Sequence, residues 1–180
     1  MPQFGSLLEA EIPRLRRYAR ALTRDAARAD DLVQGCLLRA VAKQHLWQEG
    51  TDLRAWLFTI LHNQHVNEVR RSAREGPAVP VEGVAGALPV KENAFDSLQL
   101  RDLDRAISRL SEEQRQVILL VGLEGMRYEQ AAQILDIPVG TVRSRLSRAR
   151  DELRALMQID EENTAALARR DATSRMRHAS

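Results

Sequence analysis

The chain has 180 residues, of which 27 are basic and 25 are acidic, so its formal net charge is +2. This length fits one ordinary domain or two small ones, and the small net charge excludes a histone-like polycation and a strongly acidic tail protein. The single cysteine, Cys36, excludes an internal disulfide and a multi-cysteine zinc site, and no apolar run approaches the roughly 18 residues that a membrane-spanning helix needs.

The composition favours helices. Aromatic residues make up 4% of the chain, and no segment alternates β-branched with polar residues as a half-buried strand would. The start of the chain lacks a basic-then-apolar signal pattern, so we expect a protein of the cytoplasm. The basic side chains are almost all arginine, with lysine only at Lys43 and Lys91. A nucleic-acid partner and codon composition both explain this bias.

Three helices are predicted in the first 75 residues. Apolar residues at helical spacing predict the first over residues 4–24, where Pro13 allows a break or a kink near Ile12. The second is expected over residues 26–45. The third begins at an N-cap of Thr51 or Asp52 and continues to about Ala73.

The composition then changes. Residues 76–90 read GPAVPVEGVAGALPV, with three prolines, three glycines and almost no charge, which predicts a linker. Helical spacing resumes over residues 95–110, and Ser111 with Gln114 predicts a capping box at the start of the next helix. That helix is expected to end near Gly122 or Gly125.

Two further helices are expected, over residues 128–135 and 139–157. The remaining tail is polar and alanine-rich, so we expect it to begin as helix and to end without regular structure. The predicted fold class is all-α, with two small helical domains joined by a Pro/Gly-rich linker. Their predicted bounds are 1–75 and 96–157, with the linker at 76–95 and the tail at 158–180.

Residues 127–153 read RYEQAAQILDIPVGTVRSRLSRARDEL and predict a helix-turn-helix. Ala132, Asp136 and Val142 stand at the spacing that this motif uses for its small residue, its turn and its packing residue. Glycine is more usual at the turn, but aspartate tolerates the left-handed conformation better than most residues. Pro138 cannot continue the first helix and suits the start of the second.

The second helix of this motif is amphipathic. On a helical wheel, one apolar stripe contains Val142, Leu146, Ala149, Leu153 and Leu156. The opposite face and its flanks carry Arg143, Ser144, Arg145, Ser147, Arg148 and Arg150. Arginine forks read guanine edges and hydroxyls hold phosphates, as a recognition helix in the major groove requires. A solvated amphipathic helix is the alternative reading of the face alone.

The helix at 26–45 has an unusual outer face. Leu32, Val33, Cys36, Leu37, Ala40 and Val41 are expected to face the core. Leu38 then lies among polar groups, which indicates either an interface or a lone surface leucine. Gly35 costs about 1 kcal/mol inside a helix and therefore calls for a reason such as close approach of a partner. Cys36 is expected to be buried and inert.

The helix at 52–73 places a tryptophan opposite its core side. Its expected core residues are Leu57, Phe58, Leu61, His65 and Val69. The outward side carries Trp56 with amides and a hydroxyl, a set that suits stacking on unpaired bases, followed by arginines that suit phosphates. The alternative is that Trp56 packs under the neighbouring HLWQEG loop. His62 and His65 have no evident third ligand, so no metal site is expected.

Three segments together resemble one protein family. They are DDLVQGCLLRA (30–40), LRAWLFTILHNQHVNEVRR (53–71) and LSEEQRQVILLVGLEGMRYEQAAQILDIPVGTVRSRLSRARDEL (110–153). They resemble the extracytoplasmic-function (ECF) sigma factors of bacteria, a branch of the sigma-70 superfamily, over roughly residues 5–157. The segment LRRYARALTRD also resembles the alphaproteobacterial general-stress type and its anti-sigma-sequestering mimics.

The resemblance implies a sigma factor that directs RNA polymerase to −35/−10 promoters in a stress response, without enzyme activity or a cofactor. The residues implied in binding the core polymerase are Asp31, Gln34, Leu38 and Arg39. Those implied at the −10 element are His45, Leu46, Trp47, Gln48, Trp56, Thr59, Asn63, Asn67, Arg70, Arg71 and Arg74. Those implied at the −35 element are Tyr128, Thr141, Arg143, Ser144, Arg145, Ser147 and Arg148.

The implied partners are the core polymerase, through its β′ clamp helices and β flap, promoter DNA and an anti-sigma factor. A monomer, or a 1:1 heterodimer with the anti-sigma factor, is expected, without membrane insertion. Off DNA, the two domains should pack against each other or a partner and cover residues 143–148 or 31–39.

Two departures and two alternatives stand beside this reading. Gly35 and Cys36 replace an acidic and a small or β-branched residue of the family pattern, and Asp136 replaces glycine. One alternative is a sigma-like mimic that sequesters an anti-sigma factor. Such mimics usually carry a receiver domain, for which 180 residues leave no room. The other is a dimeric helix-turn-helix repressor, which predicts a palindromic operator.

Overall fold

A computed structural model of the chain describes residues 4–75 and 94–177, and over these ranges it contains helices and no strands. The all-α prediction is confirmed. The predicted linker lies almost wholly outside the described residues. The α-helices are α1 (Phe4–Thr23), α2 (Ala26–Ala42), α3 (Leu53–Glu75), α4 (Ala94–Arg109), α5 (Glu112–Ile118), α6 (Tyr128–Leu135) and α7 (Val139–Arg177). A 3-10 turn, η1 (Gln44–Leu46), follows α2, and a π-helical turn, η2 (Leu119–Leu123), follows α5.

The N-terminal half, α1–α3, begins two of its helices at aspartate N-caps. Asp25 accepts a hydrogen bond from the Arg28 N–H at 3.0 Å, and Asp52 accepts one from the Ala55 N–H at 3.0 Å. Asp52, rather than Thr51, therefore caps α3. The helix α2 ends at Ala42 and not at residue 45, because the chain turns into the 3-10 conformation there.

Pro13 does not break α1, which runs unbroken from Phe4 to Thr23. A proline inside a helix removes one backbone hydrogen bond and costs about 3 kcal/mol or more. Leu8 and Leu15, on either side of it, are both buried in the core. Burial of that shared apolar face offsets the local cost and keeps the helix in one piece.

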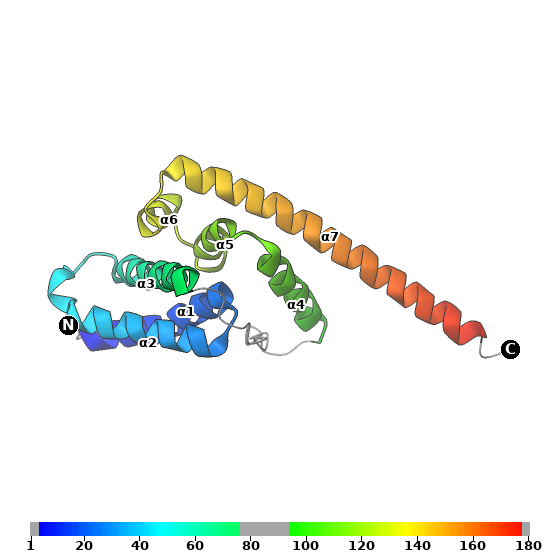
Figure 1. The fold of residues 1–180 in the computed structure, drawn as a ribbon, viewed down its shortest axis with the longest axis horizontal. Coiled ribbons are helices and arrows are strands. Elements are labelled where there is room, and N and C mark those ends of the chain that lie inside the picture. Colours follow the sequence, from blue (N-terminus) through cyan, green and yellow to red (C-terminus); the bar gives the residue numbers. More distant parts are fainter. Residues whose placement is uncertain (1–3, 76–93, 178–180) are drawn as a thin grey trace.

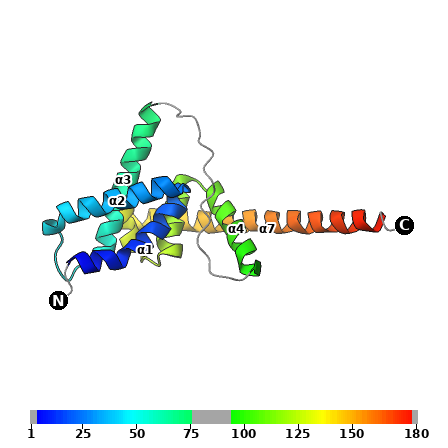
Figure 2. The same cartoon turned by 90° about the horizontal axis from the view of Figure 1, so that it is seen from below.

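In the C-terminal half, α4–α7, most helices begin and end near the predicted residues. Ser111 and Gln114 form the predicted capping box at the start of α5. The helix α5 passes into η2, which ends at Leu123, near the predicted end at Gly122 or Gly125. Gly125 follows with a φ of +66°, in the left-handed region that favours glycine. The bounds of α6 match the predicted ones. The helix α7 does not end at Met157 but continues to Arg177, well beyond the other helices (Figures 1 and 2).

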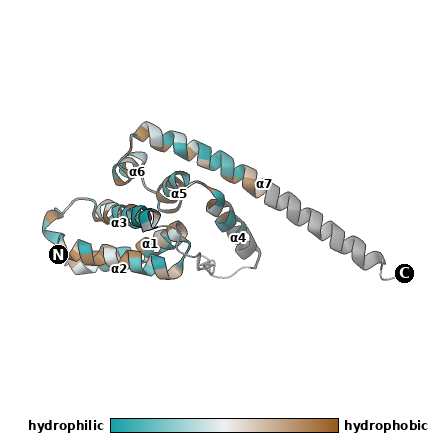
Figure 3. Ribbon diagram, in the orientation of Figure 1, coloured by the Kyte–Doolittle hydropathy of each residue, from teal (hydrophilic) through white to brown (hydrophobic). Residues whose placement is uncertain are grey.

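The two halves share one apolar core. Buried residues of α1–α3, such as Leu15 and Phe58, and of α5–α7, such as Leu120 and Ile134, belong to the same cluster. The contact is made by α3 against α6, which lie side by side in Figures 1 and 3, and by α1 against η2. The expected packing of one domain on the other is therefore confirmed, although residues 143–148 and 31–39 are not covered by it.

Gly35 allows α2 and α3 to approach closely. A Cβ atom at Gly35 would clash with the amide group of Gln64, lying 2.8 Å from its Oε1 atom. Gln64 is buried on α3, where its amide donates to Glu68 Oε1 at 3.0 Å. The close partner that the sequence left unidentified is thus a side chain of this same half.

Two residues predicted to face the core are exposed. Val41 is 51% exposed and Val69 is 41% exposed. Both lie towards the C-terminal ends of their helices, where a helical wheel still assigns an inner side. The wheel records only angle around one axis, so it does not register where the neighbouring helices stop.

Candidate nucleic-acid interface

The helix-turn-helix forms as predicted. Asp136 adopts φ 52° and ψ 49°, and the next N–H, that of Ile137, donates to the Ala132 carbonyl at 3.1 Å. Pro138 stands just before α7, and its carbonyl accepts from the Thr141 N–H at 2.9 Å. The chain therefore reverses through one left-handed residue, which orients α7 across α6.

The first turns of α7 are anchored by an apolar stripe. Val142, Leu146 and Ala149 are buried. On the outer face, Arg143, Ser144, Ser147 and Arg148 are exposed, and Thr141 is half-buried. The Ser144 hydroxyl donates to the Thr141 carbonyl at 3.1 Å. Because the stripe fixes the rotation of α7, these polar groups face solvent on one side of a rigid helix.

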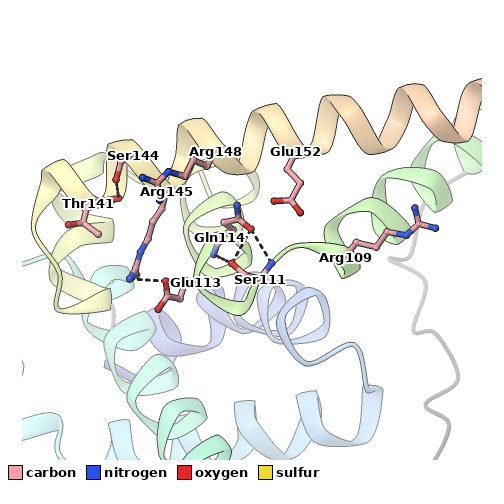
Figure 4. Close-up of a pocket in the computed structure, with 9 residues that line it drawn as sticks. All are labelled: Arg109, Ser111, Glu113, Gln114, Thr141, Ser144, Arg145, Arg148 and Glu152. Carbon is pink, nitrogen blue, oxygen red and sulfur yellow. Dashed lines mark hydrogen bonds and ion pairs between the residues drawn. The ribbon is translucent and has the colours of Figure 1, made fainter.

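Arg145 lies differently from the other arginines of this helix. Its side chain is 24% exposed, and its Nη2 atom lies 3.0 Å from Glu113 Oε2 on α5. Figure 4 shows it directed from α7 towards α5. Arg145 therefore braces α7 against α5 within the same half of the protein. Tyr128, at the start of α6, is half-buried.

An open polar pocket of about 710 Å³ lies between α7 and the start of α5 (Figure 4). It brings four of the residues predicted at the −35 element together with five that were not predicted there: Arg109, Ser111, Glu113, Gln114 and Glu152. Ser111 and Gln114 were recognised only as a helix cap. The Ser111 N–H and hydroxyl both lie near Gln114 Oε1, at 3.1 and 3.0 Å. Their position beside the recognition helix depends on how α5 packs on α7.

A second surface lies on α2. Asp31, Gln34, Leu38 and Arg39 are all exposed on the outward side of this helix, and Leu38 is 67% exposed. The structure thus brings together the four residues that the resemblance assigned to polymerase binding. An exposed leucine framed by two charges and an amide is suited to contact with another protein.

The two tryptophans near the start of α3, Trp47 before it and Trp56 within it, are packed against another aromatic ring and are not fully exposed. Phe4 packs against Trp47, with ring centroids 5.5 Å apart, and against Trp56 at 6.4 Å. Both tryptophans are half-buried. Trp56 is therefore packed, as in the alternative interpretation, and the residue that covers it is Phe4 of α1. Nothing in the sequence near Trp56 indicates Phe4, because the two are far apart along the chain.

A third surface consists of η1, the residues just after it and the outer side of α3, and its remaining predicted residues are mostly exposed. His45, Leu46 and Gln48 are exposed in and after η1. Thr59 is half-buried, and its hydroxyl donates to the Ala55 carbonyl at 2.9 Å. The exposed polar residues along α3 are Asn63, Asn67, Arg70, Arg71 and Arg74. This helix therefore presents amides and guanidinium groups along its outer length.

Three groups in the core have pKa values far from the ordinary ones, and burial is the largest cause for each; it raises the pKa of the Tyr18 hydroxyl. Burial raises the pKa of the Cys36 thiol to about 12, and the thiol donates to the Leu57 carbonyl at 3.4 Å. The expectation that Cys36 is buried is confirmed, and a neutral thiol is a poor nucleophile. Burial, with a smaller effect of His65, lowers the pKa of His62 from 6.5 to about 4.

The low pKa of His62 predicts lower stability in mild acid. Between pH 6.5 and 4 the unfolded chain binds a proton at His62 that the folded chain does not, so stability falls as pH falls. We expect the unfolding free energy to drop by about 2 kcal/mol from pH 7 to pH 5 through this group. Urea unfolding followed by tryptophan fluorescence at both pH values measures the drop.

His62→Leu should lack most of this pH dependence, because leucine binds no proton. The control is His45→Leu, at an exposed histidine. An equal loss of stability in wild type and His62→Leu would contradict the assignment.

Within the described residues, no three potential ligands lie close enough to hold a metal ion. No helix in the same ranges has the length and apolarity needed to cross a membrane.

Comparison with known proteins identifies relatives of both halves. A family model described as the Sigma2 domain of PhyR matches residues 8–62, and one described as sigma-70, region 4, matches residues 100–153. The relative named ECF RNA polymerase sigma factor EcfG, from Rhodopseudomonas palustris, is 40% identical over 167 residues. The match covers 89% of this chain and 90% of that relative.

Solved structures share the fold. The co-crystal structure of the sigma factor RpoE with the anti-sigma factor NepR, from Bartonella quintana, is 38% identical with a TM-score of 0.76. The match covers 89% of this chain and 99% of that chain. The anti-anti-sigma factor PhyR, crystallised with NepR from the same organism, is 19% identical with a TM-score of 0.55. It covers 84% of this chain and 49% of that chain, and at this identity it shows the fold alone.

Proposed function

Because the chain belongs to the extracytoplasmic-function family of RNA polymerase sigma factors, we propose that three of its surfaces divide promoter binding and polymerase binding among them. A sigma factor is a transcription initiation factor and not an enzyme, since the polymerase carries out the chemistry. The outer face of α7 reads the −35 element, the outer side of α3 with η1 contacts the −10 element, and the outer side of α2 docks on the polymerase.

The observation that carries this proposal is the arrangement of side chains on the first turns of α7. Its buried stripe fixes the rotation of α7, so Arg143, Ser144 and Arg148 face solvent together. Arginine forks on such a face match guanine edges, and the hydroxyl groups match phosphates. The pocket between α7 and α5 adds hydroxyl, amide and guanidinium groups beside the same face, together with the carboxylates of Glu113 and Glu152, of which Glu113 is paired with Arg145.

The outer side of α2 fits a protein partner better than DNA. It combines an exposed leucine with Asp31, whose negative charge would repel phosphates. We assign it to the β′ clamp helices of the core polymerase, and we assign the C-terminal half to the β flap. The chain works in the cytoplasm as a monomer, or as a 1:1 complex with an anti-sigma factor, in a stress response. The likeness to RpoE, crystallised with NepR, supports an anti-sigma partner.

Transcription in vitro tests the proposal directly. The purified chain is mixed with core polymerase and a library of promoters that vary in the −35 and −10 elements. We expect initiation from a defined subset, lost when either element is altered and absent with core polymerase alone. Failure to initiate anywhere in the library, with polymerase binding intact, would overturn promoter recognition by this chain.

A sigma-like mimic is the second candidate, because residues 8–62 match a model named after PhyR. A mimic binds an anti-sigma factor and not the polymerase. Absence of polymerase binding in a pull-down with purified core enzyme would therefore favour the mimic. A dimeric repressor instead predicts twice the monomer mass by light scattering, together with binding to a palindromic site.

A further inference from the structure

A buried glutamate of the C-terminal half is held by two arginines of the N-terminal half. The Glu124 side chain is 0% exposed. Its Oε1 atom lies 2.9 Å from Arg17 Nη2 of α1, and its Oε2 atom lies 3.2 Å from Arg54 Nη2 of α3. Arg54 also donates to the Glu124 carbonyl oxygen. Both carboxylate oxygens and the backbone of Glu124 thus bind the opposite half.

Three smaller contacts also link the two halves. His65 Nε2 lies 2.7 Å from Glu112 Oε1, and Arg24 Nη2 lies 3.4 Å from Asp104 Oδ2. The Gln130 amide of α6 donates to Asp52 Oδ2 at 2.5 Å, at an exposed position. Every one of these pairs joins the N-terminal half to the C-terminal half. The Glu124 cluster differs from them because its carboxylate is wholly removed from water.

Some buried polar groups near the interface between the halves have no hydrogen-bond partner. Among the described residues, the Tyr18 hydroxyl, Arg54 Nε and His62 Nδ1 are buried without a hydrogen-bond partner. Such groups carry a desolvation cost that water would remove if the halves separated. Burial of the Glu124 charge carries a further desolvation cost, which its two arginine partners offset. The Glu124 cluster therefore acts alongside the shared apolar core, and loss of one partner would leave a buried charge unpaired in the closed arrangement.

The closed arrangement is too short to span a promoter. The helix α7 packs on α6, and α6 packs on α3. With about 8–10 Å between packed helix axes, the α7 and α3 axes lie on the order of 20 Å apart at these contacts. Elements centred at −35 and −10 are separated by about 25 base pairs, or about 85 Å of duplex at about 3.4 Å per base pair. The two proposed DNA-binding surfaces therefore cannot bind the −35 and −10 elements of one promoter at the same time until the halves separate.

We propose that Glu124, held by Arg17 and Arg54, is a latch that keeps the two halves closed and must be released before the chain binds both promoter elements. The need for release rests on the proposed function, whereas the latch itself is a property of the protein alone. The latch is suited to control, because any partner that competes for Arg17 and Arg54 would shift the chain towards the open form.

A distance measurement on the isolated chain tests the latch. Cysteines placed at the exposed positions Ala27 of α2 and Gln133 of α6 carry a fluorophore pair, while the buried Cys36 is left unlabelled. Glu124→Gln keeps the shape of the side chain but removes its charge. We expect the open fraction to rise by about tenfold or more, since one partner of a buried ion pair is lost. The matched control is Glu129→Gln, at an exposed glutamate of the same half.

Equal open fractions in Glu124→Gln and Glu129→Gln would overturn the latch. Circular dichroism of each variant establishes that its helices are intact. Arg17→Gln provides a second route, because Arg17 is 43% exposed and its loss disturbs the core less. We expect it to raise the open fraction as well, and an unchanged distance in both latch variants would reject the proposal.

A reversible crosslink separates the latch from the promoter function. Asp52→Cys and Gln130→Cys, at the exposed contact between the halves, are joined by a short crosslinker that a reductant cleaves. We expect the crosslinked chain to lose at least about tenfold in initiation and to regain it on reduction. Full initiation by the crosslinked chain would overturn the need for release. If the uncrosslinked chain fails to initiate but Glu124→Gln still opens it, the promoter function fails and the latch stands.

Discussion

Replacing Arg143 and Arg148 together by alanine is expected to lower initiation at a matched promoter by at least about 30-fold. Both side chains are exposed on the outer face of α7. A fork bound to a base edge contributes about 1–3 kcal/mol, so two of them contribute about 2–6 kcal/mol. Gel-shift titration against promoter fragments with and without the −35 element measures the loss in binding, and runoff transcription measures the loss in initiation.

The control for this prediction is Arg154→Ala on the same helix. Arg154 is exposed, but it lies beyond the pocket and is paired with Asp151 at 2.8 Å. We expect little change from it, because exposed ion pairs contribute about 0–1 kcal/mol. Polymerase binding should stay intact in every variant. If the double variant kept its preference for the −35 element, the assignment of α7 as the recognition helix would be wrong.

Replacing Leu38 by aspartate is expected to weaken binding to the core polymerase by about 100-fold. Leu38 is 67% exposed in the isolated chain, so the substitution should leave folding nearly unchanged. At a protein interface, the change removes about 1.5–3 kcal/mol of apolar burial and introduces a charge that must be desolvated. Biolayer interferometry with immobilised core polymerase measures the change in affinity.

Ala27→Asp is the matched control, because it adds the same charge at an exposed position on the same helix. It lies in the first turn of α2, where a negative charge is compatible with the helix dipole. We therefore expect polymerase binding close to that of wild type. Equal losses in both variants would indicate a general effect of charge, and no loss in Leu38→Asp would place the polymerase contact elsewhere.

Local signals were sufficient for much of the fold. The capping box at Ser111 and the left-handed turn at Asp136 involve residues within five positions of each other, and both form as predicted. Pro138 stands just before α7, and η2 ends at Leu123, near the predicted end at Gly122 or Gly125. These features could be predicted because backbone groups at a helix end must find hydrogen-bond partners nearby, and the partners are written into the adjacent residues.

Predictions failed where packing outweighed a local rule. Pro13 was expected to allow a break or a kink near Ile12, and no break occurs, because burial of Leu8 and Leu15 on one face keeps α1 continuous. Val41 and Val69 were assigned to the core by their wheel positions and are exposed. A helical wheel gives the direction of a side chain around its own axis, whereas burial depends on whether another helix extends that far.

The candidate surfaces divide in the same way. The polar outer face of α7, the exposed face of α2 and the arginines of α3 could be predicted from the order of residues, since each lies on a single helix with a regular period. The packing of whole helices was needed to show that Phe4 covers Trp47 and Trp56, and that Gln64 fills the space left by Gly35. It alone also joined Glu124 to Arg17 and Arg54, across 107 and 70 residues. Contacts over such separations leave no periodic trace, because they arise from how whole helices pack and not from the order of neighbouring residues.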